Sequence, residues 1–151
     1  MSYVPRYIMK RIVPMDALAN YDTTGDGRPD HVGLTYVNLL APLEIPQDLD
    51  PDDLISQLKE VAIDDAPLDR EAVLAGQVWY EGEKFTLENL AAAAGRTVPI
   101  GGRLLILLPY PGGLPEGKHK VRLVTEYQGQ QSVTEFEREV SADRLCLEAP
   151  K

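Results

Sequence analysis

The stretch of residues 77–123 most constrains the fold, because it sets several kinds of local structure in a fixed order. Its centre is the run LLILL at residues 104–108, which lies between Gly101-Gly102 and Pro109. A short apolar run bounded by turn residues predicts a strand that is buried on both faces. Around it we expect a strand at 77–81, a helix at 87–94 that Thr86 caps and Gly95 ends, a turn at 111–117 and an alternating strand at 119–127.

The rest of the chain adds short strands separated by proline and glycine residues. Strands are predicted at 7–13, 31–40, 60–63, 132–140 and 144–147, with turns at 64–69, 81–84 and 128–130. Asp50 can cap a short helix that begins at Pro51. Because strands and helices do not alternate regularly, we predict an all-β fold, an antiparallel β-sandwich of about seven or eight strands with one or two short helices. We expect a single domain over residues 1–151.

The composition limits the classes of partner. Acidic residues outnumber basic ones by 24 to 15, which gives a formal charge of −9. This charge repels phosphate backbones and anionic membrane surfaces, so we expect neither nucleic acid nor a membrane as a partner. We find no secretion signal and no apolar run near the ~18 residues that span a bilayer. The single cysteine, Cys146, excludes an internal disulfide bond, and we predict a cytoplasmic protein.

One loop resembles part of a calcium-binding loop. Asp22, Thr24, Asp26 and Asp30 place oxygen atoms at positions 1, 3, 5 and 9, and position 6 is a glycine. Position 12 is Gly33, where such a loop has a bidentate glutamate. The alternative is a polar hairpin loop, because Asp-Gly is a common turn dipeptide. The four residues are therefore a weak calcium candidate.

Nothing in the sequence predicts a catalytic residue. His31 and His119 stand at the starts of separate strands, without other metal ligands at the usual spacing. Acidic clusters at 48–53 and 64–69 coincide with a helix start and a turn, where aspartate is favoured for local reasons. The glycine pairs at 101–102 and 112–113 lack the following helix that a phosphate site needs. We therefore expect no catalytic residue and no cofactor in this chain.

Two segments carry a resemblance to a known family. The sequences EGEKFTLENL at residues 81–90 and PGGLPEGKHKV at 111–121 resemble the small β subunit of the bacterial C-glycoside deglycosidases. The resemblance extends more weakly over residues 7–40 and 61–68. It implies a β-sandwich that packs against a large, metal-dependent TIM-barrel α subunit.

The resemblance also implies an activity. In that family the complex cleaves the carbon–carbon bond between a 3-oxo-sugar and an aromatic aglycone, so this chain is expected to be the non-catalytic or pocket-completing subunit of a lyase. The divalent metal, Mn or similar, and the base belong to the large subunit. Because aromatic side chains are enriched at subunit interfaces, we expect contacts with the partner or the substrate at Trp79, Tyr80, Tyr110, Pro111, Gly112 and Gly113.

One segment departs from the family pattern. Family members carry a Pro-Tyr-Tyr-Arg-Gly-like segment after the second strand, whereas this chain has NLLAPL at residues 38–43. A partner barrel with another sugar substrate is consistent with this change. Two alternatives stay open: a free-standing β-sandwich binding module, stabilised by calcium at residues 22–30, and a structural assembly protein of a larger sugar-catabolic complex.

Overall fold

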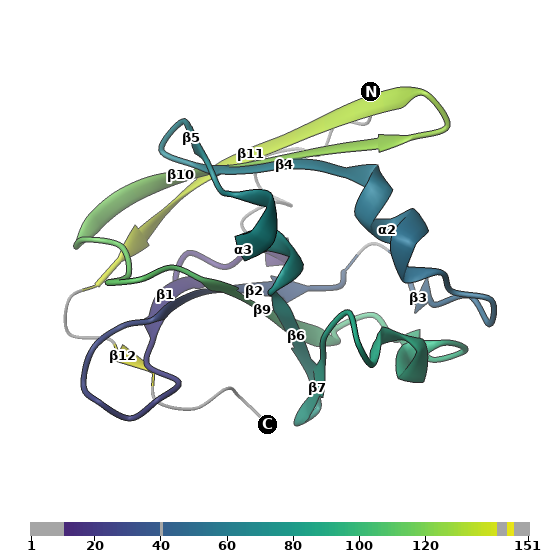
Figure 1. Ribbon diagram of the computed structural model, residues 1–151, viewed down its shortest axis with the longest axis horizontal. Coiled ribbons are helices and arrows are strands. Elements are labelled where there is room, and N and C mark those ends of the chain that lie inside the picture. The colour runs from purple at the N-terminus through teal and green to yellow at the C-terminus, as the bar shows by residue number, and fades with distance from the viewer. Residues whose placement is uncertain (1–10, 40, 142–144, 147–151) are drawn as a thin grey trace.

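Two β-sheets packed face to face form the body of the protein (Figure 1). The computed structural model describes residues 11–39, 41–141 and 145–146. One sheet has six strands in the order β12-β1-β2-β9-β6-β7, the other has four in the order β11-β10-β4-β5, and β3 and β8 form a separate pair. Strands β1 and β12 pair in parallel, and the other pairs are antiparallel. The all-β sandwich with two short α-helices is confirmed.

The described residues form twelve strands, more than the seven or eight predicted, because four strands have only two residues each. In the six-stranded sheet they are β1 (Leu18–Tyr21), β2 (His31–Val37), β6 (Gln77–Tyr80), β7 (Glu83–Phe85), β9 (Arg103–Pro109) and β12 (Leu145–Cys146). In the four-stranded sheet they are β4 (Leu58–Ile63), β5 (Ala66–Pro67), β10 (Gly117–Tyr127) and β11 (Gln130–Val140). The small pair consists of β3 (Leu43–Glu44) and β8 (Thr97–Val98).

Three hairpins are closed by two-residue turns in which both residues have positive φ. The φ angles are 53° and 66° at Asp64 and Asp65, 51° and 82° at Glu81 and Gly82, and 51° and 77° at Gln128 and Gly129. Positive φ at both positions gives the turn the twist of the flanking strands, which suits a two-residue hairpin loop. The predicted turns at 64–69, 81–84 and 128–130 therefore form hairpins.

The helices are short and only partly follow the predictions. Helix α2 (Pro51–Gln57) begins as expected, because the Asp50 carboxylate accepts a hydrogen bond of 3.0 Å from the backbone N–H of Asp52. Helix α3 (Arg70–Leu74) was not predicted. The helix predicted at 87–94 is wrong, since only the 3₁₀ turn η1 (Leu90–Ala93) forms. The Thr86 hydroxyl and backbone N–H both donate to Oδ1 of Asn89, at 3.2 and 2.6 Å, so the hydroxyl does not accept from a backbone N–H as a helix cap would.

The start of the chain also differs from the prediction. Of the strand expected at 7–13, residues 7–10 lie outside the described residues, and Arg11 and Ile12 are helical. Ile12, Val13 and Ala17 form a buried cluster, so burial rather than strand pairing accounts for the apolar pattern. Strand β1, which pairs with β2 on the side opposite β9, was not predicted.

Strand β9 shows that the two faces of the six-stranded sheet are buried to different extents. Leu105 and Leu107 are almost fully buried in a cluster with Ala19 and Tyr21 on the outer face. Leu104, Ile106 and Leu108 alternate with them on the inner face and are only half-buried. The predicted two-sided burial therefore holds incompletely, because the space between the sheets is not filled.

Among the described residues, no helix is long and apolar enough to cross a membrane.

Candidate functional site

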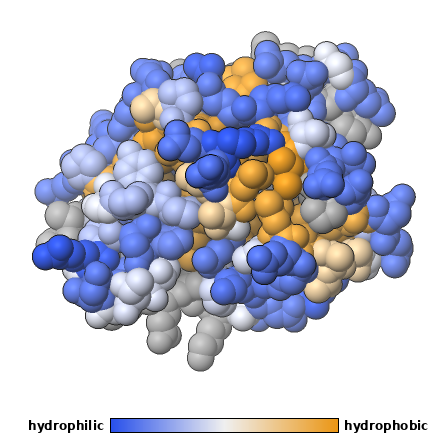
Figure 2. All heavy atoms as spheres, viewed as in Figure 1, coloured by the Kyte–Doolittle hydropathy of each residue, from blue (hydrophilic) through white to orange (hydrophobic). Residues whose placement is uncertain are grey.

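An open apolar cavity of about 380 Å³ lies between the two sheets. One wall comes from the six-stranded sheet, with Leu18, Val32, Leu34, Ile106 and Leu108. The facing wall comes from the four-stranded sheet, with Val61, Ile63, Val121 and Leu123. Figure 2 shows apolar side chains visible within a hollow of the surface, surrounded by hydrophilic ones. Because these walls converge from distant segments, periodicity in the sequence did not reveal the cavity.

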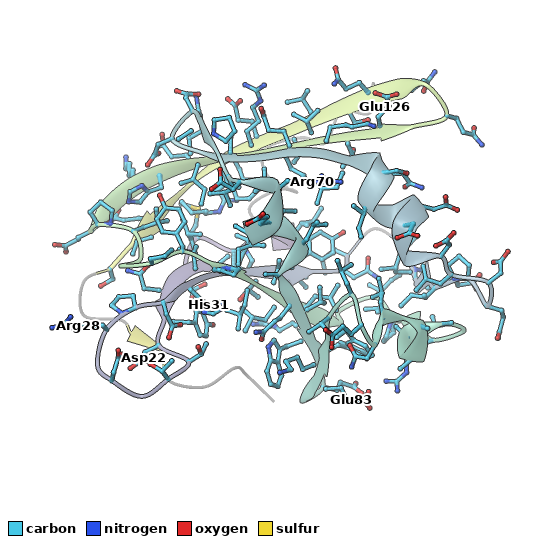
Figure 3. All side chains as sticks on the ribbon, in the orientation of Figure 1. Asp22, Arg28, His31, Arg70, Glu83 and Glu126 are labelled. Carbon is cyan, nitrogen blue, oxygen red and sulfur yellow. The ribbon has the colours of Figure 1, made fainter. Side chains whose placement is uncertain are left out.

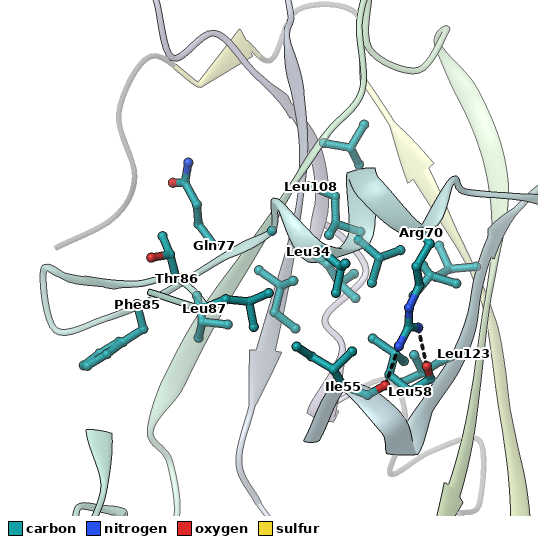
Figure 4. A pocket seen from close by; sticks show the side chains of 18 of the residues that line it. Leu34, Ile55, Leu58, Arg70, Gln77, Phe85, Thr86, Leu87, Leu108 and Leu123 are labelled. Atoms are coloured by element: carbon teal, nitrogen blue, oxygen red, sulfur yellow. Dashed lines mark hydrogen bonds between the residues drawn. The ribbon is translucent and has the colours of Figure 1, made fainter. Parts of the chain in front are cut away.

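Helices α2 and α3 form the mouth of the cavity, with the segment that follows β7. Ile55, Val73, Leu74 and Leu87 add apolar side chains there. Two polar residues on the lining, Gln77 and Thr86, turn their polar ends away from the cavity (Figure 4). The Gln77 Oε1 atom instead accepts a hydrogen bond of 3.0 Å from the indole Nε1 of Trp79. The interior is therefore almost entirely hydrocarbon.

Arg70 is the exception at the mouth. Figure 3 places it at helix α3, and Figure 4 shows its guanidinium reaching across to helix α2. Its Nη1 and Nη2 atoms donate hydrogen bonds of 2.5 Å to the carbonyl oxygens of Leu58 and Ile55. These carbonyls lie at the end of α2, where the Ile55 carbonyl also accepts from the backbone N–H of the C-cap residue Leu58. Arg70 thereby connects the two helices and is the one ionisable residue among the described residues that line the cavity.

Two of the predicted contact residues lie on opposite faces of strand β6. Trp79 pairs with Leu105 and packs against the outer-face cluster of the six-stranded sheet. Tyr80 points to the other face and lines a second hollow of about 400 Å³ with Glu81 and residues 99–103. Partial burial, and after it the Glu81 carboxylate, raise the pKa of the Tyr80 phenol. Ile100, which also lines this hollow, is 57% exposed.

The other four predicted contact residues form the turn between β9 and β10. Tyr110 packs against the core, whereas Pro111 and Gly112 are exposed. A Cβ atom at Gly113 would lie 2.6 Å from Oδ1 of Asn20, so this position has no room for a side chain. Trp79 pairs with Leu105 near the opposite end of β9, roughly 17 Å from Tyr110 at the rise of an extended strand. The six residues therefore do not form one continuous site.

A buried side-chain amide holds the same turn in place. Asn20 on β1 donates from Nδ2 to the carbonyl of Leu114 and accepts from the Leu114 N–H, both at 2.8 Å. Leu114 is itself buried in the core between the sheets. These two hydrogen bonds fix the turn to strand β1 of the six-stranded sheet. Sequence analysis missed Asn20, because its partner lies 94 residues away.

The loop of residues 22–30 is organised by its own hydrogen bonds. The buried carboxylate of Asp22 accepts from Thr24, and from the N–H groups of Gly25 and Gly27 at 2.8 and 2.7 Å. Burial alone would raise the pKa of Asp22, but these donors lower it below its ordinary value. Asp30 accepts from Thr23 and from His31.

The remaining candidate oxygens of the loop are also engaged. Asp26 accepts from the N–H of Arg28, and the Thr24 hydroxyl donates to Asp22. In the part of the chain that the structure describes, no group of three or more His, Cys, Asp or Glu residues is placed to hold a metal ion. The calcium hypothesis for Asp22, Thr24, Asp26 and Asp30 stays a prediction.

No protein-family model matches the chain, and no curated protein matches it. The function must therefore be inferred from the fold, the two hollows and the resemblance of the segments described above.

Proposed function

We propose that this chain is the small β subunit of a heteromeric C-glycoside deglycosidase, working in the cytoplasm beside a large TIM-barrel subunit. The proposal is supported by the resemblance at residues 81–90 and 111–121 and by the β-sandwich architecture. The first segment comprises the turn between β6 and β7, the edge strand β7 and the turn toward η1, and the second connects the two sheets.

The observation that carries the proposal is the second hollow. Ile100 is 57% exposed there beside Tyr80, so an apolar group and a phenol face solvent together. Subunit interfaces have an apolar centre with aromatic residues and a polar rim. Glu81 and Arg103 supply charged groups around this hollow. We therefore assign the docking surface for the large subunit to the hollow around Tyr80 and Ile100, defined by Tyr80, Glu81 and residues 99–103.

The proposed chemistry belongs to the complex. A 3-oxo group acidifies the neighbouring C2–H of the sugar, so a base and a divalent metal in the large subunit can drive elimination of the aglycone. The small subunit would close the substrate pocket and exclude water. Its own residues take no part in proton transfer under this proposal.

The test is co-expression with the neighbouring reading frame, which the proposal expects to encode a TIM-barrel subunit. We expect the two chains to co-purify and to cleave a 3-oxo-C-glucoside only together. Ile100→Asp should weaken the complex by about tenfold or more, because it replaces the exposed apolar side chain of this surface with a charge. Val133→Asp is the matched control, since Val133 is 45% exposed on β11 and lies outside the hollow. An isolated chain that stays monomeric and leaves the barrel's activity unchanged would refute the proposal.

The cavity between the sheets favours a second candidate function, a free-standing binding module. Its volume of about 380 Å³ is in the range of small-molecule sites. Ligand binding by the purified chain in the absence of any barrel subunit would support this function. Obligate assembly before any binding would contradict it.

A further inference from the structure

The cavity between the sheets has the composition of a site for a hydrocarbon chain. Its walls are aliphatic, with Leu34 and Leu108 on one sheet and Val61 and Leu123 on the other. The ring of Phe85, at the rim, points away from the interior (Figure 4). Phe136 is the other aromatic residue of the lining, and the rest of the apolar wall consists of leucine, isoleucine and valine side chains, which flexible methylene groups can follow better than a flat aromatic ligand can.

The size of the cavity limits the length of the chain. If each carbon group takes ~30 Å³, the share of one water molecule in the liquid, a volume of about 380 Å³ holds roughly a dozen carbons. The cavity is open to solvent on the face that Figure 2 shows, and Ile55 of α2 and Val73 and Leu74 of α3 belong to its lining. A ligand would therefore enter by one end and leave its head group at the mouth.

Arg70 determines the chemistry of that head group. A guanidinium has five N–H donors, and Arg70 uses two of them on the carbonyls of Leu58 and Ile55. The other three have no partner among the described residues. Asp69 and Glu71 flank Arg70 in the sequence but do not line the cavity. The carbonyl bonds hold the cation at the mouth, where it matches a carboxylate.

We propose that the cavity between the sheets binds a medium-chain aliphatic carboxylate, with the alkyl chain between the sheets and the carboxylate at Arg70. The inference does not rest on the proposed subunit role, because it concerns only the interior of this chain. A neutral alcohol of the same length is the competing ligand class. The carboxylate and the alcohol are distinguished only by how their head groups interact with Arg70.

The first experiment measures Kd for saturated carboxylates of six to sixteen carbons with the full chain, by calorimetry below their aggregation concentrations. Each methylene that enters the cavity should tighten binding by about fourfold. The gain should stop near a dozen carbons, when the cavity is full. Affinity that keeps rising smoothly to sixteen carbons, or no saturable binding at all, would overturn the proposal.

A change in cavity size gives the second readout. Leu123→Ala removes three carbons from the wall, so the chain length at which the gain stops should increase by about three. Val133→Ala, at an exposed site on the same sheet, should leave that length unchanged. The measured quantity is the chain length at which affinity stops increasing, and a modest loss of stability would not change that length. An unchanged length in Leu123→Ala would contradict binding in this cavity.

The third readout concerns the head group. We expect decanoate to bind about fivefold more tightly than decan-1-ol, a modest ratio because Arg70 is exposed. Arg70→Gln should bring the ratio close to one, whereas Arg28→Gln, at an exposed arginine of the 22–30 loop, should preserve it. Equal affinity for both ligands in the unmodified protein, or a ratio unaffected by Arg70→Gln, would reject the carboxylate assignment.

Discussion

His119 on strand β10 and Asp64 in the turn between β4 and β5 form a hydrogen-bonded pair. Nδ1 of His119 lies 2.5 Å from Oδ2 of Asp64, and Nε2 lies 2.6 Å from the carbonyl oxygen of Pro115. Because both ring nitrogens face acceptors, the arrangement is satisfied only by the protonated imidazole. Burial opposes this charge, but the Asp64 carboxylate and the Pro115 carbonyl outweigh it and raise the pKa of His119. The hydrogen bond from His119, then that from the Lys120 N–H, lowers the pKa of Asp64.

The pair predicts a specific dependence of stability on pH. A raised His119 pKa stabilises the fold fully below the unfolded value near 6.5, and the effect is lost as the pH rises through the folded pKa. A lowered Asp64 pKa stabilises the fold above its unfolded value of 3.8, and the effect is lost as the pH falls through the folded pKa. The contribution is therefore greatest between these two unfolded values.

Asp64→Asn tests this window. We expect it to lower the free energy of unfolding by about 1 kcal/mol at pH 5.5, a small value because half of the Asp64 side chain is exposed, and by less at pH 9. Asp65→Asn, which removes the neighbouring exposed pair with Lys120, is the matched control. Urea denaturation at the two pH values measures both variants. An equal loss at both pH values in Asp64→Asn would contradict the charged pair.

Asn20→Ala should destabilise the protein by roughly 2–3 kcal/mol. The substitution removes two buried hydrogen bonds and leaves the N–H and carbonyl of Leu114 without their partner. Asn89→Ala should cost much less, because water can replace the bonds of its exposed side chain. Urea titration of both variants measures the difference, and similar losses would show that the Asn20 bonds are not decisive.

Gly33→Ala should destabilise the sandwich by about 1–3 kcal/mol. A Cβ at this position would lie 2.3 Å from the Tyr21 ring and 2.9 Å from Leu107, so the outer-face cluster must move. Thermal unfolding measures the loss. In a Tyr21→Ala background the added cost of Gly33→Ala should shrink, because the main clash is gone. If Gly33→Ala costs the same stability in the Tyr21→Ala background, the clash with the Tyr21 ring is not the cause of the loss.

The alternative interpretation of residues 22–30 as a polar hairpin loop predicts that calcium does not change the melting temperature. The Asp22 carboxylate already accepts four hydrogen bonds from its own loop, and Asp30 is engaged by Thr23 and His31. A ligand that binds only the folded state would raise the midpoint, so melting scans with excess calcium and with EDTA decide the question. A clear upward shift with calcium, absent in Asp26→Asn, would establish the calcium loop instead.

Local signals in the sequence predicted local structure well. The two-residue turns at Glu81-Gly82 and Gln128-Gly129 formed where expected, since glycine takes positive φ without strain. The Asp50 cap and Pro51 likewise placed the start of α2. These features depend on neighbours within a few residues. The helix predicted at 87–94 failed at its start, because the Thr86 hydroxyl donates to Asn89 and does not accept from a backbone N–H of the first turn.

The sequence by itself thus determined the strand-rich class, the hairpin turns and the start of one helix, because each follows from backbone preferences over a short span. Only the tertiary structure decided which side chains meet. His119 and Asp64 are 55 residues apart, and Asn20 and Leu114 are 94 apart. The cavity is also a tertiary product, because the inner faces of β9 and β10 look like ordinary core strands. Only the separation of the two sheets leaves their side chains half-buried and Arg70 at an open mouth.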